Sequence, residues 1–158
     1  NSILCRSEKY AQAFAGQIKL VEGRLQCPAG FKITFHQVQQ EAIDIVGGIN
    51  RAQHAYFFET QNFAENYSEL GYTPSNTYFN YKINLLKNGE LAQATVTPRF
   101  DHLKSYLGGV VFAKDTNSFQ SIVCASNKPT KNITQSIKLV NDQLYCPTGF
   151  KISVPETK

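Results

Sequence analysis

Apolar residues recur with a helical period in the stretch that follows residue 35. Within residues 35–63 they fall at steps of three and four, at Val38, Ala42, Ile45, Ile49, Ala52 and Tyr56. This spacing places them on one face and predicts a long amphipathic helix. Gly47 and Gly48 interrupt the pattern, which predicts either close packing against the helix backbone or a bend.

The period changes to two after the turn-rich residues 69–76. Along residues 77–87 one face carries Phe79, Tyr81, Ile83 and Leu85. The alternation predicts a strand whose apolar face lines a core shared with the helix. Asn88-Gly89 then predicts a hairpin turn into a return strand at 91–98.

Three further apolar segments complete the pattern. Residues 107–114 and 118–125 predict two more strands, and residues 136–146 predict a small hairpin. The result is one long N-terminal helix followed by an antiparallel sheet of about four strands. We therefore predict an α+β fold.

The chain carries one segment twice. "CPAGFKI" at 27–33 returns as "CPTGFKI" at 146–152, and an offset of 119 positions aligns residues 3–35 with 122–154 without a gap. Fifteen of these 33 positions are identical. The pattern indicates a tandem duplication, and a circular permutation or a fusion is the alternative. We expect residues 36–158 to form a complete globular domain, and residues 1–35 to be the β-rich end of a partial unit.

Four cysteines sit inside the repeated segment. They form two sets, Cys5 with Cys27 and Cys124 with Cys146, each separated by 22 positions. An even count at equal spacing favours disulfides and an oxidising compartment, and zinc is disfavoured because no C-x-x-C pair exists. Four cysteines permit three connectivities, and the repeat favours pairing within each copy.

Composition limits the partners of the chain. It has 158 residues, 42% of them hydrophobic and 18% charged, with a net charge of +4, as expected for a globular protein. No run of Lys or Arg exists, so a solvated basic surface is favoured over a specific nucleic-acid groove. The longest apolar runs are too short to span a bilayer. The absence of an initial Met suggests a processed product.

No motif indicates catalysis, a metal or a cofactor. The histidines His36 and His54 are five helical turns apart, and Asp101-His102 lacks a nucleophile context. The carboxylates are scattered, and no glycine-rich phosphate loop is present. We predict no catalytic residue, no metal site, no cofactor and no enzyme activity.

Consecutive aromatic residues end the predicted helix. Tyr56, Phe57 and Phe58 cannot all point inward, so at least one of them faces solvent or a neighbour. Core packing is the simpler interpretation, and a contact surface is the more specific one. We predict that these three residues, together with Tyr72, form an interaction surface.

The order of elements and several segments resemble a known family. A long helix, a meander of strands and a disulfide-closed C-terminal segment resemble the type IV pilins. More narrowly, "GGINRAQHAYFFETQNFAENYSELG" (47–71), "LKSYLGGVVF" (103–112) and "SIVCAS" (121–126) resemble the cyanobacterial type IV pilin-like proteins of the G/H family. The chain departs from a conventional pilin because "CPAGFKITF" precedes its helix, in place of an apolar, membrane-embedded half.

The resemblance implies a non-enzymatic structural or interaction module at the cell surface or in the periplasm, in a pilus, pseudopilus or surface filament. Protein partners or self-association are expected, with a membrane contact only through a segment absent from this chain. The alternative is a periplasmic sensor or ligand-binding domain that uses the same fold, because fold alone does not decide function.

Overall fold

The computed structural model describes residues 5–7, 19–21, 24–26, 31–33, 36–74 and 78–153, with side chains for 38–74 and 78–153. The helices are α1 (His36–Thr60) and the single turn α2 (Tyr67–Leu70). The strands of the main sheet are β5 (Phe79–Leu86), β6 (Leu91–Pro98), β7 (Tyr106–Ala113), β8 (Ser118–Ser126) and β11 (Phe150–Ile152). Short strands are β1 (Cys5–Ser7), β2 (Lys19–Val21), β3 (Arg24–Gln26), β4 (Phe31–Ile33), β9 (Lys138–Val140) and β10 (Gln143–Tyr145), and a 3-10 turn η1 (Lys87–Gly89) joins β5 to β6.

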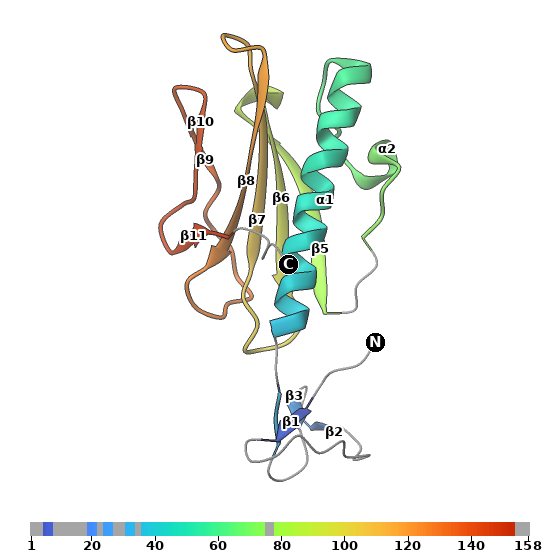
Figure 1. The fold of residues 1–158 in the computed structure, drawn as a ribbon, viewed down its shortest axis with the longest axis vertical. Coiled ribbons are helices and arrows are strands. Elements are labelled where there is room, and N and C mark those ends of the chain that lie inside the picture. Colours follow the sequence, from blue (N-terminus) through green and yellow to red (C-terminus); the bar gives the residue numbers. More distant parts are fainter. Residues whose placement is uncertain are drawn as a thin grey trace.

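One antiparallel sheet, in the order β11-β8-β7-β6-β5, carries α1 along one face (Figure 1). The predicted α+β class is therefore confirmed, and the strands from β5 to β8 lie where the alternation placed them. The fifth strand, β11, was not expected in the sheet. It joins because its three residues pair with Cys124, Ala125 and Ser126 at the end of β8.

The face of the sheet beneath α1 holds most of the core. Val38, Ala42 and Val46 of the helix pack with Phe79, Val96 and Tyr106, all buried. Further along the helix, Ile49 packs with Ile83 and Ala94, and Leu85 packs beside Phe57. The four residues predicted to line this core, Phe79, Tyr81, Ile83 and Leu85, all lie in these clusters.

The two helix glycines do not break α1, which runs through both. A Cβ on Gly48 would lie 3.2 Å from the hydroxyl oxygen of Tyr72, and one on Gly47 would lie 3.4 Å from the Arg51 guanidinium. Close packing, and not a helix break, is therefore the role of Gly48. The small residue lets the Tyr72 ring cover the helix backbone.

The opposite face of the sheet is covered by the C-terminal segment. Ile137 is 4% exposed and packs with Leu91, Leu107 and Cys124. The hairpin of β9 and β10 adds Leu139 and Leu144 to this cluster. The domain therefore has three layers, with α1 and the C-terminal segment on opposite sides of the sheet (Figure 1).

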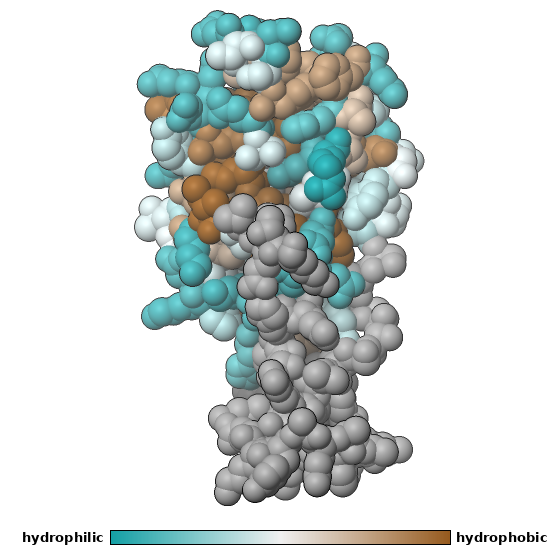
Figure 2. Space-filling view, in the orientation of Figure 1, coloured by the Kyte–Doolittle hydropathy of each residue, from teal (hydrophilic) through white to brown (hydrophobic). Residues whose placement is uncertain are grey.

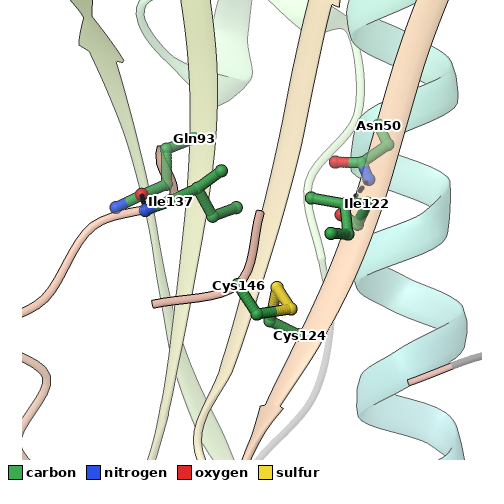
Figure 3. Close-up of a disulfide and its surroundings, with 6 residues drawn as sticks. All are labelled: Asn50, Gln93, Ile122, Cys124, Ile137 and Cys146. Atoms are coloured by element: carbon green, nitrogen blue, oxygen red, sulfur yellow. Dashed lines mark hydrogen bonds between the residues drawn. A yellow bond between two sulfur atoms is a disulfide. The ribbon is translucent and has the colours of Figure 1, made fainter. Parts of the chain in front are cut away.

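A disulfide and two buried amides fasten these layers (Figure 3). Cys124 in β8 is joined to Cys146, which closes the C-terminal segment. The side chain of Gln93, 4% exposed, accepts a 2.8 Å hydrogen bond from the backbone N–H of Ile137. On the other face, Asn50 donates a 3.1 Å hydrogen bond to the Ile122 carbonyl, which ties α1 to β8.

The short N-terminal strands repeat the C-terminal pairing. β1 pairs with β4 through Cys5↔Ile33 and Ser7↔Phe31, and β8 pairs with β11 through Cys124↔Ile152 and Ser126↔Phe150. The β2–β3 pair likewise matches the β9–β10 pair, with Leu20↔Leu25 against Leu139↔Leu144. Every one of these pairs is displaced by the same 119 positions that separate the two similar segments of the sequence.

Candidate interaction surface

A cluster of aromatic rings lies where α1 ends. Phe119 of β8 is at its centre, with ring centroids 4.4 Å from His54, 5.5 Å from Phe57 and 5.1 Å from Phe58. Phe112 of β7 is directly paired with Phe119 across the strands, with ring centroids 5.0 Å apart. Such offset and edge-on arrangements stabilise aromatic pairs beyond the effect of burial.

Phe58 is the exposed member of this aromatic cluster. Its side chain is 70% exposed, whereas Phe57 is half-buried between Phe63, Phe112 and Phe119. Figure 2 shows the corresponding hydrophobic area over the end of α1. A large ring held out of the core by a rigid helix is a feature typical of protein contact surfaces.

The other two predicted surface residues lie elsewhere. Tyr56 is half-buried on α1, between the cluster members His54 and Phe57 in the sequence. Tyr72 packs on Gly48 and belongs to the cluster of Ile49 and Ile83. The structure thus brings together Phe57 and Phe58 and separates both from Tyr72.

Two further tyrosines lie beside Tyr72. The hydroxyl oxygens of Tyr67 and Tyr81 are buried without a hydrogen-bond partner among the described residues. Burial raises the pKa of both phenols well above the usual value of 10.0, with a smaller contribution to Tyr81 from the Glu41 carboxylate. Both phenols therefore stay protonated at every ordinary pH.

A hollow of about 350 Å³ adjoins the aromatic cluster at the same end of the molecule. Phe57, Phe63 and Phe112 contribute apolar walls. The polar lining includes Glu90, Asp115, Asp142 and Lys114, from three different turns. These carboxylates are solvated and spread around the rim, an arrangement with no evident acid–base pair.

Sequence reasoning did not find His54, Phe112 or Phe119 as members of the cluster. Phe112 and Phe119 flank the turn at residues 114–117. A tight hairpin at that turn places the two residues opposite each other, so this pair could have been predicted from the sequence. Nothing in the local pattern of His54 indicates its stacking on Phe119, because that contact joins residues 65 positions apart (119 − 54).

The environment of His54 predicts a pH dependence of stability. Its Nε2 is buried without a hydrogen-bond partner among the described residues, and burial lowers its pKa below 6.5. The unfolded chain therefore takes up this proton first as pH falls. The stability that neutral His54 contributes is present above about pH 6.5 and is lost below it.

The variant His54→Phe should lose less stability than the wild type between about pH 7 and pH 5. Urea unfolding at several pH values in that range measures the difference. His102→Asn is the matched control, because His102 is exposed and has a φ of 71° that Asn tolerates. Equal pH slopes for His54→Phe and the wild type would contradict this role of His54.

Phe58 offers a test of the exposed surface. Phe58→Ser should change the free energy of unfolding by less than about 1 kcal/mol, because the ring is largely in water. If the ring forms protein contacts, the variant should self-associate less than the wild type in sedimentation velocity. Tyr145→Ser, at an aromatic residue that is 49% exposed on β10, is the control and should behave like the wild type.

Among the described ranges, no group of three or more His, Cys, Asp or Glu side chains is placed to hold a metal ion. In the same part of the chain, no helix is both long and apolar enough to cross a membrane. Cys27, which is the predicted disulfide partner of Cys5, lies outside the described residues. The Cys5–Cys27 disulfide therefore stays a prediction.

A long helix packed on an antiparallel sheet, with a C-terminal segment closed by a disulfide, defines the class of pilin-like proteins. A family model described as type IV pilin-like G and H matches residues 39–147. This match covers more than half of the chain, which therefore belongs to the type IV pilin-like G and H family. No curated protein and no solved structure matches it.

Membership of this family indicates a structural, non-enzymatic kind of protein. A pilin-like fold implies assembly with other pilin subunits, and the family suggests a surface or extracytoplasmic location. The Cys124–Cys146 disulfide fits such a location, because disulfides persist in oxidising compartments.

Proposed function

We propose that the protein is a structural and interaction module of a cell-surface filament or related extracytoplasmic assembly. The observation that carries this proposal is the family match over residues 39–147 on a helix-and-sheet domain closed by Cys124–Cys146. The exposed ring of Phe58, at the opposite end of α1 from His36, is the surface that we assign to subunit or partner contacts.

Fractionation of the natural host tests this role. Antibodies against residues 36–153 should detect the protein in the material that shearing releases from the cell surface, sedimenting with filaments. Alkylation before reduction, followed by peptide mass mapping, should find Cys124 joined to Cys146 in that fraction. A protein found only in the cytoplasm with free thiols would overturn the proposal.

A sensor or ligand-binding role is the second candidate. The hollow beside Phe57 and Phe112 supports it, because its volume of about 350 Å³ is in the range of small-molecule sites. Thermal unfolding in the presence of sugars, amines and amino acids would distinguish the two. A saturable rise in Tm that Phe112→Ala abolishes would favour the sensor.

We further propose that residues 1–35 are the C-terminal end of a preceding pilin-like unit. The support is the common register of the β1–β4 and β8–β11 pairs, and of the β2–β3 and β9–β10 pairs, at an offset of 119 positions. Since β8 also pairs with β7, β1 is expected to pair in turn with a β7-like strand.

Intact mass and peptide mapping of the natural protein test this tandem arrangement. A mass well above 17.7 kDa, with a second helix-and-sheet sequence upstream of Asn1, would support it. A natural protein that begins at Asn1 would overturn it and would leave residues 1–35 as an element with a function of its own.

A further inference from the structure

Among the described residues, strand β8 has an edge that is paired over only part of its length. On the side away from β7, β11 pairs only with Cys124, Ala125 and Ser126, and one more hydrogen bond runs from the Ser153 N–H to the Val123 carbonyl. Backbone groups alternate in direction along a strand, so Ser121 and Phe119 point the same way as Val123. Within the described ranges neither residue has a backbone partner on that side.

The open edge lacks the usual protection against strand pairing. Residues 118–126, "SFQSIVCAS", contain no charged residue and no proline. The other edge of the same sheet, β5, carries an exposed Lys82 and an exposed Asn80. Natural sheets block free edges with charges, prolines or covering segments. This contrast between the two edges indicates that the β8 edge is suited to pairing with a further strand.

A groove of about 430 Å³ runs along this edge. One wall is α1, which contributes Gly47, Arg51 and His54, and the other includes Leu144 of β10. The lining that remains includes Ile122, Val123 and Ile152, and Ile152 is 65% exposed. Figure 2 shows this hydrophobic area beside α1, over strand β8. Side chains of α1 and β10 flank the edge on its two sides. The groove is therefore wide enough for a single strand, whereas a second sheet would collide with these side chains.

The charge of the groove favours a partner segment that carries a carboxylate. Arg51 is exposed and has no ion pair among the described residues, and no Asp or Glu lines the groove. We propose that the groove binds an extended strand of a partner protein, with apolar residues in alternation and a carboxylate that meets Arg51. Its backbone would pair with Phe119 and Ser121, which is strand addition to a sheet edge.

The chain's own C-terminal residues suit this edge poorly. In the β11–β8 register, residue numbers of a pair sum to 276, so position 155 would fall opposite Ser121. That position is Pro155, which has no N–H to donate to the Ser121 carbonyl. A partner strand without proline there can donate to the Ser121 carbonyl as well as accept from the Ser121 N–H.

A designed peptide tests the proposal. The probe is acetyl-Glu-Val-Thr-Val-Thr-Val-Glu-amide, added to the full chain while amide hydrogen exchange is followed by NMR. Exchange at Phe119 and Ser121 should slow by about tenfold or more at saturation, as expected for amides that enter a ladder. A peptide N-methylated at alternate residues should give no protection.

Charge reversal provides the matched control. The variant Arg51→Glu should bind the Glu peptide about three- to tenfold more weakly, as expected for one partly solvated ion pair. It should prefer the peptide in which Lys replaces both Glu residues. Lys82→Glu, which changes the same charge on the opposite edge, should leave both affinities unchanged.

Three outcomes would overturn the proposal. In the first, Phe119 and Ser121 stay unprotected with the peptide, or the N-methylated peptide binds equally well. In the second, both amides are protected in the full chain and become exposed on truncation after Ser153, which would make the chain's own tail the occupant. In the third, protection without peptide rises with protein concentration, which would indicate a second copy. The assay needs no filament, so it fails or succeeds separately from the proposed function.

Discussion

Replacing Cys124 and Cys146 together by alanine is expected to lower the free energy of unfolding by about 3 kcal/mol. The disulfide closes a loop with a sequence separation of 22, which restricts the unfolded chain. That loop carries Ile137 and the β9–β10 hairpin onto the far face of the sheet. Without the bond, the apolar contacts and hydrogen bonds such as those of Ile137 with Gln93 and of Thr130 with Leu103 and Ser105 would hold the segment.

The loss should be uneven across the domain. Amides of β9, β10 and β11 should exchange faster in the double variant, while those of α1 and β6 should keep most of their protection. Urea unfolding measures the total effect, and hydrogen exchange locates it. Replacing Cys5 and Cys27 by alanine is the matched control from the similar N-terminal segment, and it should leave the stability of residues 36–153 unchanged. A double variant of Cys124 and Cys146 as stable as the wild type would contradict this account.

Gly108→Val is expected to destabilise the domain by about 3 kcal/mol, the upper part of the usual range for overpacking. Gly108 lies on β7 directly beneath α1. A Cβ there would lie 2.5 Å from Cγ1 of Val46 and 2.7 Å from Oδ1 of Asn50. The helix would have to move away from the sheet, which would also strain the Asn50–Ile122 hydrogen bond.

The neighbouring glycine provides the comparison. A Cβ on Gly109, on the opposite face of β7, would meet Cδ1 of Ile137 at 2.7 Å, and that atom is the flexible end of a side chain. Gly109→Ala should therefore cost less than Gly108→Ala in urea unfolding. Adding Val46→Ala should recover part of the loss in Gly108→Ala, because it removes the clashing methyl group. Equal losses at the two glycines, without recovery, would show that the backbone and not the helix contact sets the requirement.

The sequence by itself determined α1, the strands from β5 to β8 and the buried face of β5. The three- and four-residue steps from Val38 to Ile49 define α1, and the alternation from Phe79 to Leu85 defines the buried face of β5. These patterns are local, because a helix or strand sets the direction of each side chain from its own backbone. The resemblance in residues 47–71 also led to the family that the match over 39–147 shows.

Only the tertiary structure decided which distant segments meet. β11 joins the sheet because the chain returns to β8 after Cys146. Phe119 contacts His54 and Phe58 because β8 begins beside the end of α1. The open edge of β8 is defined in the same way, by how few residues β11 covers. Such contacts bring together residues that are far apart in the sequence. The periodicity of side chains shows which face of an element is buried, but not which distant element packs against that face.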